Sequence, residues 1–297
     1  MKSLAPSICK NLLAKDIRNF KGQDLLVSQG NFNVYLVESY QIPNVLLEIG
    51  LLREKTFREA GEGANKERDI DKYDAYYKQL IIWDKNDSSI AGGYRIGMGD
   101  TIMEAFGIDG FYLSSLFNIN HPFGTILSKS LELGRSYIIS EYQKQRLPLY
   151  LLWKGILAFL IKNPQYQYLI GPLSISKNYS DISKEVIRAF IEKHFYEHEL
   201  AKHISPKKKF AYAGKYLDAE TILQEMNGEI MQLDKFVKQM EPFNIGLPIL
   251  LKKYIKLNAK IVGFNIDPNF SDVLDGFMVL DLQSVSLEII ESLNAEV

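Results

Sequence analysis

The chain has a single cysteine, Cys9, among its 297 residues, and it has almost no net charge. One cysteine excludes an internal disulfide and fits a reducing compartment. The formal charge of −1 leaves no global field that would attract a nucleic acid or an acidic membrane surface. A site for a polyanion must therefore be a local patch, and we expect a cytoplasmic protein.

A long apolar stretch is also missing. The longest apolar run, LPLYLLWKGILAFLI at 147–161, is interrupted by Lys154 and is shorter than the roughly twenty residues that cross a bilayer. Charges recur throughout the N-terminal segment, which is unlike a secretory signal. We therefore expect no membrane-spanning helix and at most a peripheral contact with the inner membrane.

The sequence does contain a clear series of strands and helices. Alternating segments rich in β-branched and aromatic residues predict strands, and apolar residues at spacings of three and four predict helices. The predicted strands are 31–38, 79–85, 90–99, 131–139, 166–176, 259–267 and 277–285. The predicted helices are 44–60, 147–162, 180–198, a helical excursion at about 218–241, and GLPILLKKYIKLN at 246–258.

The order of these elements decides the fold class. Two pairs of successive strands, 79–85 with 90–99 and 259–267 with 277–285, have no helix between them. Such short connections exclude an all-parallel doubly wound sheet. We expect an α/β fold with a mixed, largely antiparallel sheet and helices on both faces, in a single domain over 1–297 with its core at about 30–285.

The predicted strand LELGRSYII at 131–139 is irregular. Glu132 and Arg135 would point to opposite faces of a regular strand, and Gly134 lies between them. A glycine within a strand often marks a bulge, which would bring both charges to one side and free backbone N–H groups from the ladder. Such N–H groups can polarise a carbonyl oxygen. The alternative is a surface ion pair on an edge strand.

A set of motifs around this strand resembles, in order, the ornithine-lipid type of N-acyltransferase, a group also labelled hemolysin. The motifs are Arg53-x-x-x-Phe57, the acidic loop DIDKYD (69–74), Gly93-Tyr94-Arg95, Glu132-Leu133-Gly134-Arg135, LPLYLLWKGI, GPLSIS, and LPILLKKYIKLNAKIVGFNID with DGFMVLDL. This group belongs to the GNAT-like superfamily and is similar to acyl-homoserine-lactone synthases. The resemblance implies a GNAT-like sheet whose bulged central strand is splayed from its neighbour.

The resemblance implies transfer of a fatty acyl group, typically 3-hydroxylated, from acyl carrier protein to the α-amine of an amino acid of the glycine or ornithine type, in aminolipid biosynthesis. Aminolysis of a thioester needs a neutral amine. Glu132 is the candidate that takes the proton, with Arg135 beside it in the catalytic site. Burial would raise the pKa of Glu132 and improve it as a base.

An amino-acid acceptor also presents a carboxylate, which a guanidinium can bind through two parallel hydrogen bonds. Arg95 and Arg135 are the candidates for this contact. The other candidate acceptor-binding residues are Arg53, Phe57, Asp71 and Asp74. Alternatively, the charged members of this set form an ion network that ties the acidic loop to the sheet, and both roles could coexist.

The segment after the strand departs from the pattern of CoA-dependent GNAT enzymes. Those enzymes have a glycine-containing turn whose N–H groups bind a pyrophosphate, but SEYQKQRLP at 140–148 contains no glycine. A carrier protein presents one phosphodiester, which Lys144 and Arg146 could bind if they are not simply solvated. We therefore expect acyl carrier protein, rather than acyl-CoA, as the co-substrate, with no tightly bound cofactor. Ser136 and Trp153 are further donor-binding candidates.

Other features allow weaker interpretations. HFYEH at 194–198 matches an inverted zinc-protease pattern, but the surrounding elements do not fit one and we expect no metal. The lysines at 207–209 could dock an acidic carrier protein or lie solvated in a loop. Phe111, Tyr112, Leu113, Phe117 and the Trp153 helix could line an acyl tunnel or belong to the core.

Two alternatives to the amino-acid N-acyltransferase remain open. One is a small-molecule acetyltransferase that uses acetyl-CoA, which a short, closed donor cleft would favour. The other is a non-catalytic partner that binds lipid or acyl carrier protein for a lysolipid O-acyltransferase, which would form complexes without turnover.

Overall fold

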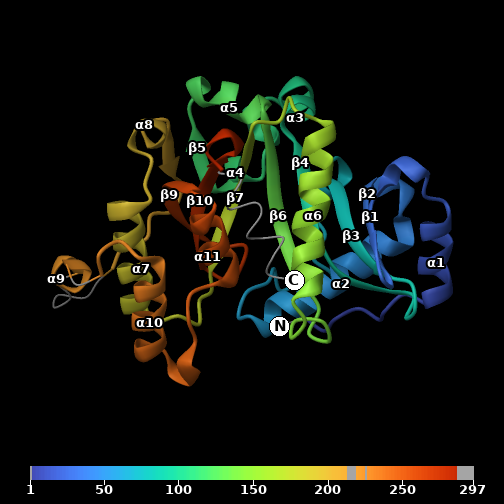
Figure 1. The fold of residues 1–297 in the computed structure, drawn as a ribbon, viewed down its shortest axis with the longest axis horizontal. Coiled ribbons are helices and arrows are strands. Elements are labelled where there is room, and N and C mark those ends of the chain that lie inside the picture. Colours follow the sequence, from blue (N-terminus) through green and yellow to red (C-terminus); the bar gives the residue numbers. More distant parts are fainter. Residues whose placement is uncertain (1, 213–218, 225, 286–297) are drawn as a thin grey trace.

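The computed structural model describes residues 2–212, 219–224 and 226–285 (Figure 1). Its centre is an eight-stranded sheet in the order β1-β2-β3-β4-β6-β7-β10-β9. These strands are β1 (Leu25–Gln29), β2 (Phe32–Glu38), β3 (Lys78–Asp84), β4 (Ser89–Met98), β6 (Ser130–Ile138), β7 (Tyr168–Ile175), β9 (Lys260–Asp267) and β10 (Val273–Asp281). All neighbouring pairs are antiparallel except β6 with β7, so the expected mixed, largely antiparallel sheet is confirmed.

Helices cover both faces of the sheet, as the alternating side chains of β3 demonstrate. Leu80 and Ile82 lie in one core cluster with α6 (Leu147–Lys162). Ile81 and Trp83 point to the other face and lie in a second cluster with α1 (Lys10–Arg18) and α2 (Pro43–Glu59). The period-two alternation of a strand thus joins two apolar layers, and the predicted arrangement is confirmed.

The second half of the sheet carries its own helices. On the α6 side, β7, β9 and β10 pack against α7 (Asp181–His194), α10 (Ile230–Met240) and α11 (Ile249–Lys256), with α9 (Ala219–Gln224) beside α7 (Figure 1). A third core cluster contains short helices and a two-stranded sheet at one end of the strands. Its elements are α3 (Gly99–Phe106), α4 (Leu113–Leu116), α5 (Gly124–Ser128), α8 (His198–Ala201), β5 (Phe117–Ile119) and β8 (Ile204–Pro206).

Most predicted elements are present, and the differences have tertiary causes. The predicted helix at 180–198 ends at His194, because the following residues pair with β9: Tyr196 forms a bridge with Ile261, and Glu197 donates its N–H to the Ile261 carbonyl at 3.0 Å. Helix α1 was not predicted. Its buried Asp16 accepts hydrogen bonds from the N–H groups of Asn44 and Val45, at the start of α2. Across the described residues, every helix is too short or too polar to cross a bilayer.

Strand β6 separates from β7 after a short contact. The two strands pair only from Ser130 to Glu132, opposite Tyr168 to Ile170. Beyond this point β7 continues with Gly171 and Pro172. A proline has no backbone N–H, so it cannot donate a hydrogen bond to a neighbouring strand. We call the diverging region between Leu133 and Ile138 on one side and Gly171 and Ile175 on the other the split. It confirms the expected splayed central strand.

Candidate active site

A bulge in β6 lies directly after Gly134. Gly93 of β4 pairs with Tyr137, and Arg95 pairs with Gly134, so Arg135 and Ser136 together face only Tyr94. Arg135 has φ +51°, a left-handed conformation that is uncommon outside glycine. The predicted bulge is therefore confirmed. It leaves Glu132 and Arg135 on a common side, where both contact Tyr112.

Two cavities border the bulged part of β6. The larger, about 820 Å³, lies between α2, β6, the segment before α6, α6 and α11. The smaller, about 260 Å³, extends between β6 and β7 and is lined by Arg135, Leu173 and Ser174 among others. Both are lined by Phe57, Glu62, Ser136, Ile249 and Leu250. The bulged segment of β6 thus borders a large and a small space at once.

The charged residues singled out in the sequence form one buried network. Arg53 Nη1 lies 2.8 Å from Asp74 Oδ1, and Arg95 Nη1 lies 2.6 Å from Asp71 Oδ1 and 3.2 Å from Asp74 Oδ2. Arg135 continues it: Nη2 lies 3.6 Å from Asp71 Oδ2, and Nε lies 2.8 Å from Oδ2 of Asp69, which was not predicted. The expected ion network between the acidic loop and the sheet is confirmed.

Burial gives this network its electrostatic character. Desolvation alone would raise the pKa of Asp74, but Arg53 and Arg95 hold it well below its usual range. Arg53 and Arg95 are 0% and 2% exposed and line neither cavity, whereas Arg135 lines the smaller one. Of the arginines in the network, only Arg135 can therefore meet a ligand in the split.

Glu132 is buried, and its carboxylate accepts three hydrogen bonds. Its Oε1 accepts from the N–H of Leu113 at 2.7 Å, and its Oε2 accepts from the N–H of Tyr112 at 3.0 Å and from the Tyr77 hydroxyl. Gly97 lies opposite Glu132, and a Cβ at Gly97 would lie 2.3 Å from the Tyr77 ring, so the glycine makes room for this arrangement.

The position of Glu132 has two consequences. Burial raises its pKa, as expected, against the opposing hydrogen bonds from Tyr77 and the two N–H groups. However, Glu132 lines neither cavity, and its contacts attach the start of α4 to the sheet. Its role as the base stays a prediction, while a structural role is visible in the geometry.

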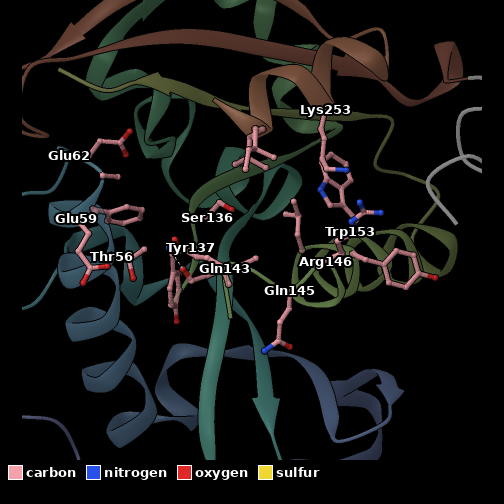
Figure 2. A pocket seen from close by; sticks show the side chains of 17 residues that line it. Thr56, Glu59, Glu62, Ser136, Tyr137, Gln143, Gln145, Arg146, Trp153 and Lys253 are labelled. Atoms are coloured by element: carbon pink, nitrogen blue, oxygen red, sulfur yellow. Dashed lines mark hydrogen bonds between the residues drawn. The ribbon is translucent and has the colours of Figure 1, made fainter. Parts of the chain in front are cut away.

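Glu62 was not singled out in the sequence, yet it lies at the split. It follows α2 and lines both cavities (Figure 2). Gly61 and Gly63 flank it with φ of +77° and +105°, and a Cβ at Gly61 would lie 2.0 Å from the Asn178 side chain. A side chain other than hydrogen is therefore disfavoured on both sides of Glu62. The tripeptide Gly-Glu-Gly in a polar loop was the available signal.

The predicted donor-binding residues are only partly brought together. Ser136, Arg146 and Trp153 line the larger cavity, where Figure 2 shows Arg146 and Trp153 near Lys253 of α11. Lys144 is exposed and is not part of this lining. Phe57 lines both cavities and packs edge-on against Phe270, with ring centroids 5.1 Å apart.

Other predicted features lie elsewhere. Phe111, Leu113 and Phe117 belong to the third core cluster and line neither cavity, so they are core rather than tunnel. In the lysine run, Lys207 donates to the Ser114 carbonyl and Lys208 pairs with Asp272, so neither is simply solvated.

Comparisons with known proteins find similar sequences among acyltransferases. Residues 52–153 match the family model described as acetyltransferase (GNAT) domain. The chain is 29% identical over 293 residues to a glycine N(alpha)-acyltransferase of Phocaeicola vulgatus, covering 92% of this chain and 86% of that protein. It is 28% identical to a protein of the same description from Bacteroides thetaiotaomicron over 288 residues, covering 92% of this chain and 84% of that protein.

More distant similarities extend the comparison. An L-ornithine N(alpha)-acyltransferase of Rhizobium meliloti is 35% identical over 114 residues, which cover 35% of this chain and 36% of that protein. Among solved structures, a CoA-dependent acyl-homoserine lactone synthase, BjaI, with SAM and isopentyl-CoA has a TM-score of 0.43 at 11% identity, covering 89% of this chain and 88% of that one. The family match covers the acidic loop, the bulged strand and the beginning of α6 (147–153), so this part of the chain matches a GNAT acetyltransferase domain.

Proposed function

We propose that this protein transfers a fatty acyl group, typically 3-hydroxylated, from acyl carrier protein to the α-amine of glycine, and so supplies an aminolipid or its precursor. The observation that carries the proposal is the pair of cavities that share Ser136 and Glu62 as lining residues. A volume of about 820 Å³ is in the range of ligand sites and suits the donor's acyl chain or arm, whereas about 260 Å³ suits a small acceptor.

The choice of acceptor has support from similarity and from size. Both glycine N(alpha)-acyltransferases match this chain over 92% of its length, whereas the ornithine relative matches 35%. Arg135 is the arginine in the smaller cavity, and it is the residue we assign to the acceptor's carboxylate. Arg95, the other candidate, would act indirectly by holding Asp71 and Asp74 in the network.

The donor assignment is supported by what surrounds the larger cavity. Arg146 and Lys253 are two cationic side chains in its lining, and a phosphodiester needs few such contacts. Helix α6 begins at Leu147 with Pro148 in its first turn, so one N–H that could bind a pyrophosphate is absent. These features favour a carrier protein over CoA, with the phosphopantetheine arm entering beside Trp153.

The split also offers a place for the thioester carbonyl. From Leu133 onward, the edge of β6 that faces β7 leaves the ladder, so its N–H groups are no longer committed to β7. A carbonyl placed along this edge could accept from them, and donors aimed at a developing oxyanion lower the barrier to acyl transfer.

Incubation of the purified protein with 3-hydroxyacyl carrier protein, and separately with the same acyl-CoA, would test these assignments. Glycine, ornithine and a panel of other amino acids would serve as acceptors, with amide products detected by mass spectrometry. We expect N-acylglycine from the carrier-protein donor. Amide only from acetyl-CoA would favour the acetyltransferase alternative, and stable binding of acyl carrier protein without any amide would favour a non-catalytic partner.

A further inference from the structure

Glu62 differs from the other acidic side chains near the split because its carboxylate has no hydrogen-bond or ion-pair partner among the described residues. The others each accept at least one hydrogen bond within the protein: Glu54, Asp69, Asp71, Asp74, Glu132, Asp267 and Asp275. Buried and half-buried carboxylates are normally satisfied, so an unsatisfied one that lines two cavities suggests a ligand as its partner.

The surroundings of Glu62 favour a cationic ligand that can give up a proton. Burial, with a smaller contribution from the repulsion of Asp275, raises the pKa of Glu62 to about 8 against the opposing effect of Arg135. Asp275 is itself buried beside Ser174, whose hydroxyl donates to it at 2.6 Å. A carboxyl with a pKa near the working pH is suited to accept a proton and release it again.

The smaller cavity therefore presents complementary groups to a zwitterion. Arg135 and Glu62 both line it, and Arg135 is held in place by Asp69 and Asp71. An α-amino acid carries a carboxylate and an ammonium group on one carbon. With its carboxylate on Arg135, its ammonium group has Glu62 as an available carboxylate in the same space.

We propose that Glu62, rather than Glu132, is the catalytic base that deprotonates the acceptor's α-ammonium group, an inference that rests on the proposed N-acyltransferase function. Glu62 takes one proton from the ammonium group. The neutral amine then forms the C–N bond with the thioester carbonyl carbon, and the C–S bond breaks. The second proton lost from the nitrogen goes to the departing thiolate, and Glu62 returns its proton to solvent.

Glu132 is less suited to this step for two reasons. It lines neither cavity, so an acceptor in the split does not reach it without displacing the Tyr112 segment. Its oxygens already accept three hydrogen bonds, two of them from the N–H groups at the start of α4. Replacement by glutamine should therefore lower kcat strongly at position 62 and leave it largely unchanged at position 132.

The direct test is Glu62→Gln, which removes the proton acceptor and keeps the shape. We expect kcat for N-acylglycine formation to fall by about 10²- to 10⁴-fold, the usual contribution of a general base. Glu67→Gln is the matched control, because Glu67 lies in the same loop and is exposed. Thermal unfolding would check that both variants fold. An unchanged kcat in Glu62→Gln, with amide still formed, would overturn the base assignment alone.

A pH profile separates a base from a merely structural residue. The titratable and charged groups around Glu62 are Asp275, Arg135, Tyr179, Glu59, Arg146 and Lys253. Asp275→Asn removes the repulsion that raises the pKa of Glu62, so the rise of kcat/KM with pH should move to lower pH than in the wild type. Ionisation of glycine is the same in both enzymes and does not contribute to this difference.

The outcomes are distinct. A profile that does not move in Asp275→Asn would overturn the role of Glu62, as would an active Glu62→Gln. Absence of amide from the wild-type protein with every donor and acceptor would overturn the proposed function and the base assignment together.

Discussion

Glu62 and Glu132 are the same side chain in two contrasting settings, one in the loop after α2 and the other within the bulged strand β6. Glu132 is closed off and accepts three hydrogen bonds from fixed donors. Glu62 faces two cavities and has no partner among the described residues. Burial raises the pKa of both. A raised pKa therefore does not identify a base by itself, because access and free lone pairs decide whether the carboxylate can act.

The contrast extends to the regions around the two glutamates. On the closed side, Arg53, Arg95 and Asp74 satisfy one another in the interior, and substitution there should reduce stability. On the open side, Arg146 and Ser136 border a cavity, and substitution there should change kinetics. Measuring the free energy of unfolding and kcat for the same variants tests this division.

The largest loss of stability is expected for Arg53→Met. It removes one of the two arginines that pair with Asp74 and leaves a buried carboxylate undercompensated. Breaking a buried ion pair typically costs about 3–5 kcal/mol. Urea denaturation would measure the free energy of unfolding, with Lys55→Met, an exposed position on the same helix, as the control. A loss no greater than that of Lys55→Met would show that the network adds little to stability.

A smaller loss is expected for Glu132→Gln. The amide keeps one acceptor oxygen but turns an NH₂ group toward backbone N–H donors that are themselves buried. Leaving such a group unsatisfied costs about 1–3 kcal/mol. Chemical denaturation would measure the loss in stability. On the same preparation, at a low temperature where the variant stays folded, kcat should be largely unchanged. A fully stable but inactive variant would reverse the comparison and restore Glu132 as the base.

Glu62→Gln should alter how stability depends on pH. The pKa of Glu62 rises from 4.5 to about 8 on folding, so the folded state binds the proton more tightly than the unfolded state. Stability of the wild type relative to Glu62→Gln should therefore fall as the pH rises from about 4.5 to about 8. Thermal unfolding of both proteins at several pH values measures this. If stability changed with pH in the same way for both proteins, the pKa of Glu62 would not be raised on folding, as in a solvated site.

The smallest effect is expected for Arg146→Ala. Arg146 is exposed at the larger cavity, and an exposed charge pair is worth about 0.2–1 kcal/mol. This energy corresponds to a rise in KM for acyl carrier protein of about 1.4- to fivefold. Lys162→Ala, at the far end of the same helix, serves as the control. Higher salt should reduce the difference between Arg146→Ala and the wild type. A KM that Arg146→Ala leaves unchanged would remove Arg146 from the donor site.

The fold was largely predictable because its signals are local. The hairpin of β3 and β4 follows from alternation around a turn, and α6 has the predicted bounds, with a proline in its first turn. Gly134 between two charges correctly indicated the bulge. Helix α1 was missed because its burial depends on α2, to which Asp16 is hydrogen-bonded.

The candidate site was predictable only in part. The arginines and aspartates of the network stand in recognisable motifs, and their pairing was expected. Glu62 was missed because its electrostatic neighbour, Asp275, lies on β10, far along the chain. No local pattern indicates that a loop residue near position 60 will lie close to β10. The aromatic residues Phe111 and Phe117 were equally ambiguous, since apolar lining and apolar core have the same composition.

The three-residue contact between β6 and β7 has a geometric consequence for substrate choice. Two strands that diverge from a fixed apex enclose a wedge-shaped gap. A slender molecule can bind closer to the narrow end of such a gap than a bulky one. An amino acid without a side chain would advance deepest, and each added branch would halt it sooner. Residues that narrow or widen the mouth would thus tune acceptor preference and leave Arg135 and Glu62 in place.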